Sequence, residues 1–183
     1  SGLNKGSLYN GYRHLLNLNT QFKGFRFVSN SSLTQSKTNT ESSLFARPRV
    51  DLSYSIQKLK NLKIGVYGEL EQIQRRDLLQ DSLKTGSFYY NLLKVYADLP
   101  ASKRLNLHVH YSRRHDYSAD SLRFRVNAIA DDFNVAGKWD ASKFSKLKWN
   151  LSYRNLAIVD TSLSNESPKE TYLGRLEYLL NIK

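Results

Sequence analysis

The chain has no cysteine among its 183 residues, and it has only three prolines and nine glycines. The lack of cysteine excludes a disulfide scaffold, a thiolate zinc site and a cysteine nucleophile. So few prolines and glycines exclude collagen-like and low-complexity chains. No window reaches the roughly 18 uninterrupted apolar residues of a transmembrane helix, because a polar residue interrupts every run sooner. A helical membrane span is therefore excluded, whereas a membrane barrel is not.

Signals for catalysis and for targeting are also missing. The sequence holds no glycine-rich phosphate loop, no Gly-x-Ser-x-Gly elbow and no metalloprotease helix motif. We therefore expect no enzyme activity, no catalytic residue and no cofactor. The chain begins at Ser1, and nothing near it resembles a signal peptide, so we expect a processed or excised chain.

What the chain does contain is enough apolar and aromatic material for one folded domain. It is 40% apolar and 12% aromatic, which is too much for a disordered coil, and its net charge is +12. We predict a flexible N-terminal segment at 1–11 and a single antiparallel β domain at 12–183.

The main signal is alternation with period two. Val50, Leu52 and Tyr54 alternate with polar residues, and a strand sends two such sets to opposite faces. The same pattern recurs along the chain. It predicts one apolar face, made of Val50, Leu52, Tyr54, Ile56, Leu62, Ile64, Val66, Leu105, Leu107, Val109, Tyr111, Leu147, Trp149, Leu151 and Tyr153.

These patterns predict an all-β fold, an antiparallel up-and-down meander of about nine long amphipathic strands that forms a β-barrel or part of one. The strands are expected at 12–22, 25–34, 47–57, 62–75, 88–98, 104–114, 122–139, 146–158 and 170–182. The segment 88–98 also fits a helical face, and we assign it to a strand because its neighbours need one. Across Asp131 and Asp132 the apolar parity changes, which predicts a β-bulge.

The connections between these strands alternate in length. Tight turns are expected at 23–24, 58–61, 100–103 and 142–145, and longer polar loops at 35–46, 76–87, 115–121 and 159–169. Short turns would thus gather at one end of the sheet and long loops at the other.

Long amphipathic strands with alternating short turns and long loops resemble the outer-membrane β-barrels of Gram-negative bacteria. The resemblance implies an apolar face toward lipid, a polar face toward the lumen, and a transport, secretion or scaffold role at the cell surface. Two features depart from the family. The family's single-chain barrels have an even number of strands, whereas nine are expected here. The family's chains usually end in an aromatic residue, whereas this chain ends in Ile182 and Lys183. Both departures suggest a segment of a larger barrel, whose open edges need partner strands or subunits.

Several side chains are candidate sites. Arg75, Arg76, Arg113 and Arg114 stand where two strands are expected to end, and guanidinium groups bind the phosphates of anionic lipid or lipopolysaccharide. The alternative is a solvated strand end with arginines paired to nearby aspartates. His108 and His110 share a strand face and are weak candidates for a metal site; otherwise they are polar residues facing solvent or a lumen.

Other groups leave alternatives open. Glu69 and Glu71 share a strand face and could act as a catalytic carboxylate pair. The alternative is that they are two ordinary polar positions of that face, with no catalytic role. The aromatics form interfacial girdles in a membrane and a core in a soluble sheet. They are Tyr54, Tyr67, Tyr89, Tyr90, Tyr96, Tyr111, Trp139, Trp149, Tyr153, Tyr172 and Tyr178.

Two other functions fit the same pattern. The first alternative is a soluble periplasmic or surface β-protein that binds a lipid or other apolar ligand inside a curled sheet. The second is a basic nucleic-acid-binding protein, in which lysines and aromatic rings share one platform. The alternation along the strand argues against a shared platform, because it places Lys146 and Lys148 on the face opposite Trp149 and Tyr153.

Overall fold

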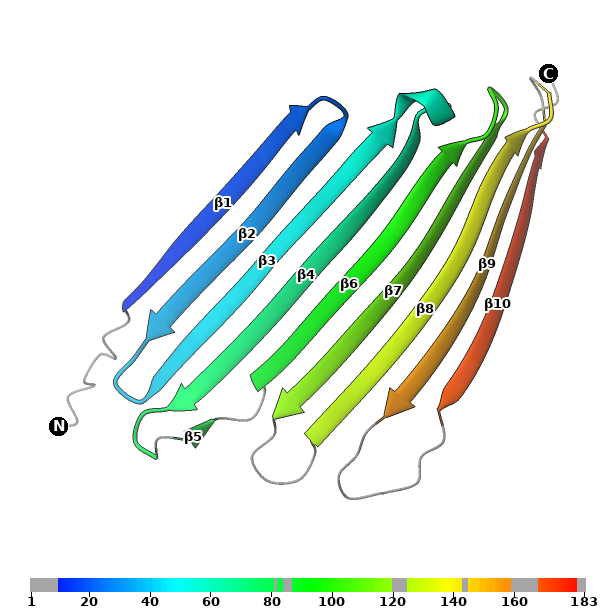
Figure 1. The fold of residues 1–183 in the computed structure, drawn as a ribbon. Helices are drawn as coiled ribbons and strands as arrows, with labels where there is room; N and C mark the ends of the chain where they lie inside the picture. Colours follow the sequence, from blue (N-terminus) through cyan, green and yellow to red (C-terminus); the bar gives the residue numbers. More distant parts are fainter. Residues whose placement is uncertain are drawn as a thin grey trace.

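The computed structural model describes residues 10–80, 82–83, 87–119, 125–142, 145–158 and 168–180. Nearly all of them lie in strands of one antiparallel sheet (Figure 1). The strands are β1 (Asn10–Phe22), β2 (Phe25–Lys37), β3 (Glu41–Ile56), β4 (Leu62–Asp77), β5 (Ser82–Leu83), β6 (Ser87–Pro100), β7 (Leu105–Ala119), β8 (Arg125–Asp140), β9 (Ser145–Ile158) and β10 (Lys169–Leu180). A single-turn 3₁₀ helix, Gln57–Leu59, follows β3. No helix in the described ranges is long and apolar enough to cross a membrane.

The sheet is a meander in which each long strand pairs with the next one along the chain. The order is β1-β2-β3-β4-β6-β7-β8-β9-β10, and the two-residue β5 pairs with β4 only. No hydrogen-bonded pairing joins β1 to β10 in the described part of the chain, so the sheet is open. The prediction of an all-β antiparallel meander with nine long strands is confirmed, including the assignment of 88–98 to a strand.

Two predicted connections are wrong. The segment 35–46 is mostly strand, because β2 and β3 pair up to Lys37 and Ser42 and leave a short turn that Thr38 closes through hydrogen bonds with Glu41. Serine and threonine suit strands as well as loops, which is why this tract suggested a loop. The segment 115–121 is also mostly strand, because β7 continues to Ala119. Most of the predicted loop 159–169, and residues 1–9 of the predicted N-terminal segment, lie outside the described residues.

The predicted bulge at Asp131 and Asp132 is absent. The register of β8 with both neighbours is continuous, and each aspartate has one partner on either side. The apparent change of parity has another cause. Ala128 and Ala130 belong to the polar face, where small side chains fit between larger ones, and Ala130 is buried there.

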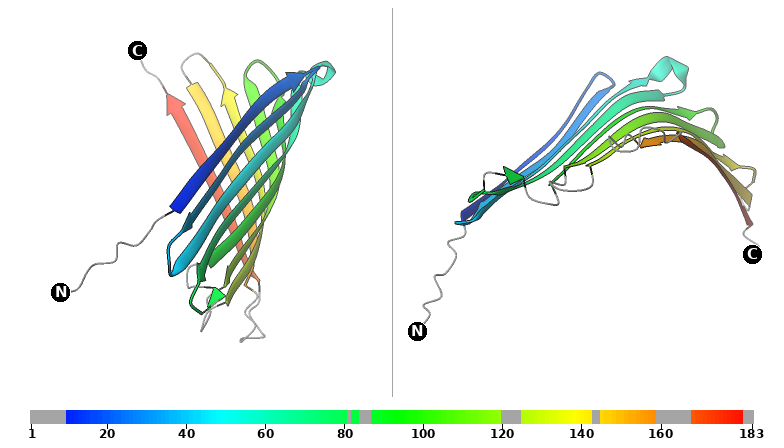
Figure 2. Two further views of the ribbon diagram at one scale, coloured as in Figure 1. Left: turned by 90° about the vertical axis from the view of Figure 1, so that its left-hand side faces the viewer. Right: turned by 90° about the horizontal axis from the view of Figure 1, so that it is seen from below.

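The sheet is arched into a gutter (Figure 2). One row of directly paired residues crosses all nine long strands: Thr20, Phe27, Leu52, Val66, Val95, Tyr111, Phe133, Tyr153 and Tyr172. Thr20 is two residues from Phe22, which ends β1, whereas Tyr172 is eight residues from Leu180, which ends β10. The row therefore shifts by six residues over eight strand-to-strand steps. A residue spans about 3.3 Å along a strand, and neighbouring strands are about 4.8 Å apart. The strands therefore tilt by about 30° relative to the axis about which the sheet curls. Such a stagger is what curls a sheet toward a barrel.

The two faces of the arch differ in crowding and in chemistry. Ser53 and Tyr96 are 5% and 8% exposed, whereas Leu52 and Val95, on the other face, are 48% and 50% exposed. Side chains crowd on the inner side of a curved sheet, so the polar face is concave and the apolar face is convex. We call the sheet end with the connections after β1, β3, β6 and β8 the turn end, and the opposite end the loop end.

Candidate functional site

The convex face carries a continuous apolar band next to the turn end. Strand pairing places all fifteen residues of the expected apolar face on this side. In β9, for example, the band runs from Leu147 through Trp149 and Leu151 to Tyr153, and then Asn155 follows on the same face. The band is about seven residues tall in β3, β7, β8 and β9, which at about 30° of tilt is about 20 Å. It is shorter in β2, where Ser29 and Ser31 follow Phe27 on the same face.

A polar belt bounds this band on the loop side. It is one cross-strand row on the convex face, made of Arg113, Asp131, Asn155 and Glu170. The tyrosines just inside the band turn their hydroxyl groups toward it. Tyr111 donates to Asp131 Oδ1 at 2.6 Å, and Tyr172 donates to Glu170 Oε2 at 3.3 Å. Rings in an apolar zone with hydroxyls at its polar border are typical of amphipathic aromatic residues at an interface.

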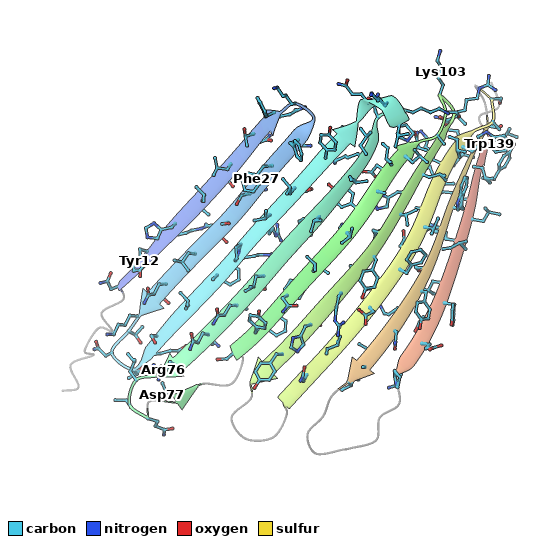
Figure 3. All side chains as sticks on the ribbon, viewed as in Figure 1. Tyr12, Phe27, Arg76, Asp77, Lys103 and Trp139 are labelled. Atoms are coloured by element: carbon cyan, nitrogen blue, oxygen red, sulfur yellow. The ribbon has the colours of Figure 1, made fainter. Side chains whose placement is uncertain are left out.

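Aromatic residues therefore border the band at both of its edges. Next to the belt, Tyr111, Phe133, Tyr153 and Tyr172 follow one another across four strands, and the Tyr153 and Tyr172 rings lie 4.9 Å apart. At the turn end the aromatic residues are Phe22, Phe25, Tyr54, Trp139 and Tyr178. Figure 3 shows Trp139 near the turn end, far from Arg76 and Asp77 at the loop end. Three of the aromatics expected in girdles, Tyr67, Tyr90 and Tyr96, belong to the concave face instead.

The four candidate arginines do not form one cluster. Arg113 and Arg114 do not close their strand, because β7 continues beyond them, but Arg113 lies in the polar belt with its Nε 3.9 Å from Asp131. Arg114 is on the concave face, where its Nε bonds Asp116 at 2.9 Å and its guanidinium lies over the Tyr90 ring. Arg75 is also on the concave side and pairs with Glu41, whereas Arg76 shares the convex face near the loop end.

The two candidate carboxylates on the concave face are held by arginines. Glu69 accepts hydrogen bonds from Arg47, Arg49 and Tyr67 at 2.6 to 2.9 Å, and its side chain is 8% exposed. Glu71 pairs with Arg47 at 3.1 Å. Because their oxygens are engaged with guanidinium groups, this arrangement braces β3 against β4 and leaves no free carboxylate pair for acid-base chemistry.

The two candidate histidines lie on the concave face and contact one another. His108 Nε2 is 3.1 Å from His110 Nδ1, and His108 Nδ1 is 2.5 Å from Asp98 Oδ1. His14 lies on β1, at the edge of the sheet. Within the described ranges, no group of three or more His, Asp or Glu side chains has the arrangement of a metal site.

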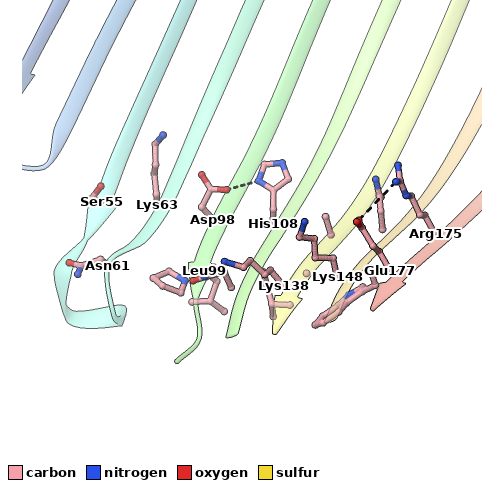
Figure 4. Close-up of a pocket in the computed structure, with 17 residues that line it drawn as sticks. Ser55, Asn61, Lys63, Asp98, Leu99, His108, Lys138, Lys148, Arg175 and Glu177 are labelled. Carbon is pink, nitrogen blue, oxygen red and sulfur yellow. Dashed lines mark hydrogen bonds and ion pairs between the residues drawn. The ribbon is translucent and has the colours of Figure 1, made fainter. Parts of the chain in front are cut away.

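An open groove of about 720 Å³ occupies the concave face near the turn end (Figure 4). Its charged lining comes from six strands, β4 and β6 to β10: Lys63, Asp98, His108, Lys138, Lys148, Arg175 and Glu177. Ala136 lies between His108 and Asn150 in the same cross-strand row, and its small side chain leaves the hollow open at that point. Period two predicted which residues share this face, but the groove was missed, because it depends on curvature and on the register of β6 to β10.

The aromatic and basic residues expected of a nucleic-acid platform lie on opposite faces. Lys146 and Lys148 are on the concave side, whereas Trp149 and Tyr153 are on the convex side. The chain matches no protein-family model, no curated protein and no solved structure.

Proposed function

We propose that this sheet forms part of the wall of a β-barrel in the outer membrane of a Gram-negative bacterium. The convex apolar band contacts the lipid, and the concave polar face lines an aqueous interior. The observation that carries the proposal is the band itself: about 20 Å of exposed apolar surface with aromatic residues at both borders. Outer-membrane barrels present an apolar band of about 25 Å with aromatic girdles at both interfaces.

The distribution of burial supports the same arrangement. Tyr96 and Ala130 are the only buried apolar residues in the part of the chain that the structure describes, while Leu93, Leu151 and Leu176 are more than half exposed. A soluble protein rarely exposes a contiguous apolar patch of more than a few hundred Å². A soluble lipid carrier would need an apolar concave face, which is the reverse of the arrangement found.

Lipid phosphate or lipopolysaccharide is the proposed partner at the border of the band. Arg113 supports this, because it lies in the polar belt on the convex face and its side chain is 59% exposed. A guanidinium at that level meets phosphate groups with a geometry suited to paired hydrogen bonds. Arg75 and Arg114 are on the concave face, so they carry no part of this contact.

The edges of the sheet support a further partner, namely additional strands. β1 and β10 are 13 and 12 residues long, contain no proline, and keep the alternation of a polar and an apolar face. Soluble proteins protect such edges with prolines, bulges or short strands. The proposed role of the wall is transport, secretion or scaffolding, without catalysis.

Folding in the presence and absence of lipid tests the proposal. The purified chain is followed by circular dichroism and light scattering in detergent-free buffer, and then with phosphatidylcholine vesicles. We expect aggregation or an unfolded spectrum in buffer and a β spectrum with vesicles. A monodisperse β-rich monomer in plain buffer would contradict a membrane wall.

A further inference from the structure

We infer that the concave groove at the turn end binds a ligand that carries a phosphate group. Four cationic side chains line it, Lys63, Lys138, Lys148 and Arg175, against two carboxylates, Asp98 and Glu177. One carboxylate is already engaged, because Asp98 bonds His108 at 2.5 Å. The groove thus has an excess of positive charge.

The arrangement of two lysines carries the inference. Lys138 on β8 and Lys148 on β9 are direct cross-strand partners, so two ammonium groups project from opposed positions of the same face. Like charges directly opposite one another destabilise a sheet. Lys138 has a partial counter-charge, since its Nζ lies 3.7 Å from Asp140. Lys148 lies opposite Glu177 of β10 but makes no ion pair with any residue that the structure describes. A dianion between the two lysines would supply a counter-charge that both ammonium groups contact.

The neighbouring groups extend the site on both sides. Arg175 on β10 is only weakly paired, at 4.0 Å from Glu177, and offers a planar donor beside Lys148. Lys63 stands on the other side, with its Nζ 5.2 Å from the centre of the Tyr96 ring. Arg and Lys together are the usual partners of phosphate oxygens.

The shape of the groove defines what else the ligand carries. Its volume of about 720 Å³ exceeds what a phosphate ion needs and falls in the range of small-molecule sites. Pro100 contributes to its lining from the concave face, and Ala136 leaves its centre open. The site therefore fits a phosphate joined to a compact organic group.

Calorimetric titration of the folded chain with inorganic phosphate and with glucose 6-phosphate tests the inference. We expect saturable binding of one molecule. Lys148→Gln removes a charge-assisted hydrogen bond, so the dissociation constant should rise about tenfold or more. Ala136→Leu keeps every charge but fills the hollow, and it should abolish glucose 6-phosphate binding.

Lys37→Gln is the matched control, because it removes the same charge from an exposed strand end outside the groove. It should leave the dissociation constant unchanged. Equal weakening by both lysine variants would show diffuse charge attraction and would overturn the site, as would the absence of saturable binding of all three phosphate ligands, inorganic phosphate, glucose 6-phosphate and phosphatidic acid. Loss of structure does not explain the effect of Lys148→Gln if the variant, folded under the conditions of the titration and without added ligand, is as stable as the parent chain.

A parallel titration with short-chain phosphatidic acid distinguishes a lipid headgroup from a soluble phosphate compound as the ligand. Binding of phosphatidic acid together with no binding of the soluble phosphates would assign the groove to a lipid headgroup. Binding of glucose 6-phosphate would assign it to a soluble ligand. The concave face is exposed with or without a bilayer, so these titrations and the vesicle experiment above can fail independently.

Discussion

The Tyr96 hydroxyl donates to Asp51 Oδ1 at 2.8 Å although a whole strand, β4, separates the two residues. The tyrosine lies directly opposite Gly65, and its ring passes over that glycine to reach β3. A Cβ at position 65 would lie 2.4 Å from the Tyr96 ring, so only glycine permits the contact. The result is a link across three strands on the concave side, where it holds the arch.

Gly65→Ala is therefore expected to destabilise the sheet. The added methyl displaces the Tyr96 ring and costs about 1–3 kcal/mol of unfolding free energy, as for other overpacked sites. Gly68→Ala on the same strand is the control, because nothing lies within 4 Å of its added Cβ. Urea unfolding of both variants measures the difference, and equal stability of the two would contradict the role of Gly65.

A second glycine is covered by an aromatic ring on the convex face. Trp149 lies opposite Gly137, and a Cβ there would come within 2.0 Å of the indole. We expect Gly137→Ala to displace the indole and change the near-ultraviolet circular dichroism of a chain whose other tryptophan is removed by Trp139→Phe. Gly174→Ala, whose Cβ meets only Leu151 at 3.5 Å, should leave the spectrum unchanged. If Gly137→Ala leaves the spectrum unchanged, the Trp149 indole does not cover Gly137.

The two faces should respond differently to the same charge. Val109→Arg places a guanidinium in the middle of the apolar band, where lipid-facing arginine costs about 2–4 kcal/mol. His110→Arg, one residue further along β7, places it on the concave face and should cost less than about 1 kcal/mol. Unfolding in vesicles compares the two variants. Similar losses from both would show that the assignment of the faces is wrong.

The glutamate held by two arginines should contribute more to stability than a weakly paired one. Glu69→Gln leaves Arg47 and Arg49 side by side without their shared carboxylate, and we expect a loss of about 2–3 kcal/mol, since the arginines are partly exposed. Glu177→Gln removes a half-buried carboxylate whose only ion-pair partner in the described part of the chain is the exposed Arg175, at 4.0 Å, and it should cost less than about 0.5 kcal/mol. Thermal unfolding measures both, and a neutral Glu69→Gln would show that the network does not brace β3 and β4.

The sequence predicted the faces well because alternation is local. The residue Leu107 is apolar and His108 is polar, and strand geometry alone separates them. Local patterns also misled in places. The serines of 35–46 suggested a loop, but Ser36 and Ser43 lie opposite one another in a paired strand, with their hydroxyl oxygens 2.5 Å apart.

Other features could not be predicted, since they depend on residues far apart in the chain. The Tyr96 contact with Asp51 needs the registers of two strand pairs, and the groove needs the curvature of six strands. Arg113 was predicted at a strand end because a charged pair follows an apolar run. The structure instead continues the strand and places Arg113 in the polar belt, where it meets Asp131.

The two native tryptophans report whether the convex band contacts the hydrocarbon interior of a bilayer. Trp149 lies within the band, whereas Trp139 lies at its turn-end border. Chains with a single tryptophan, made by Trp139→Phe or Trp149→Phe, are folded into vesicles that contain lipids brominated along the acyl chain. We predict strong quenching of Trp149, and weaker quenching of Trp139 by bromines near the bilayer centre. If acyl-chain bromines leave the fluorescence of Trp149 unquenched, the convex band does not contact the hydrocarbon interior.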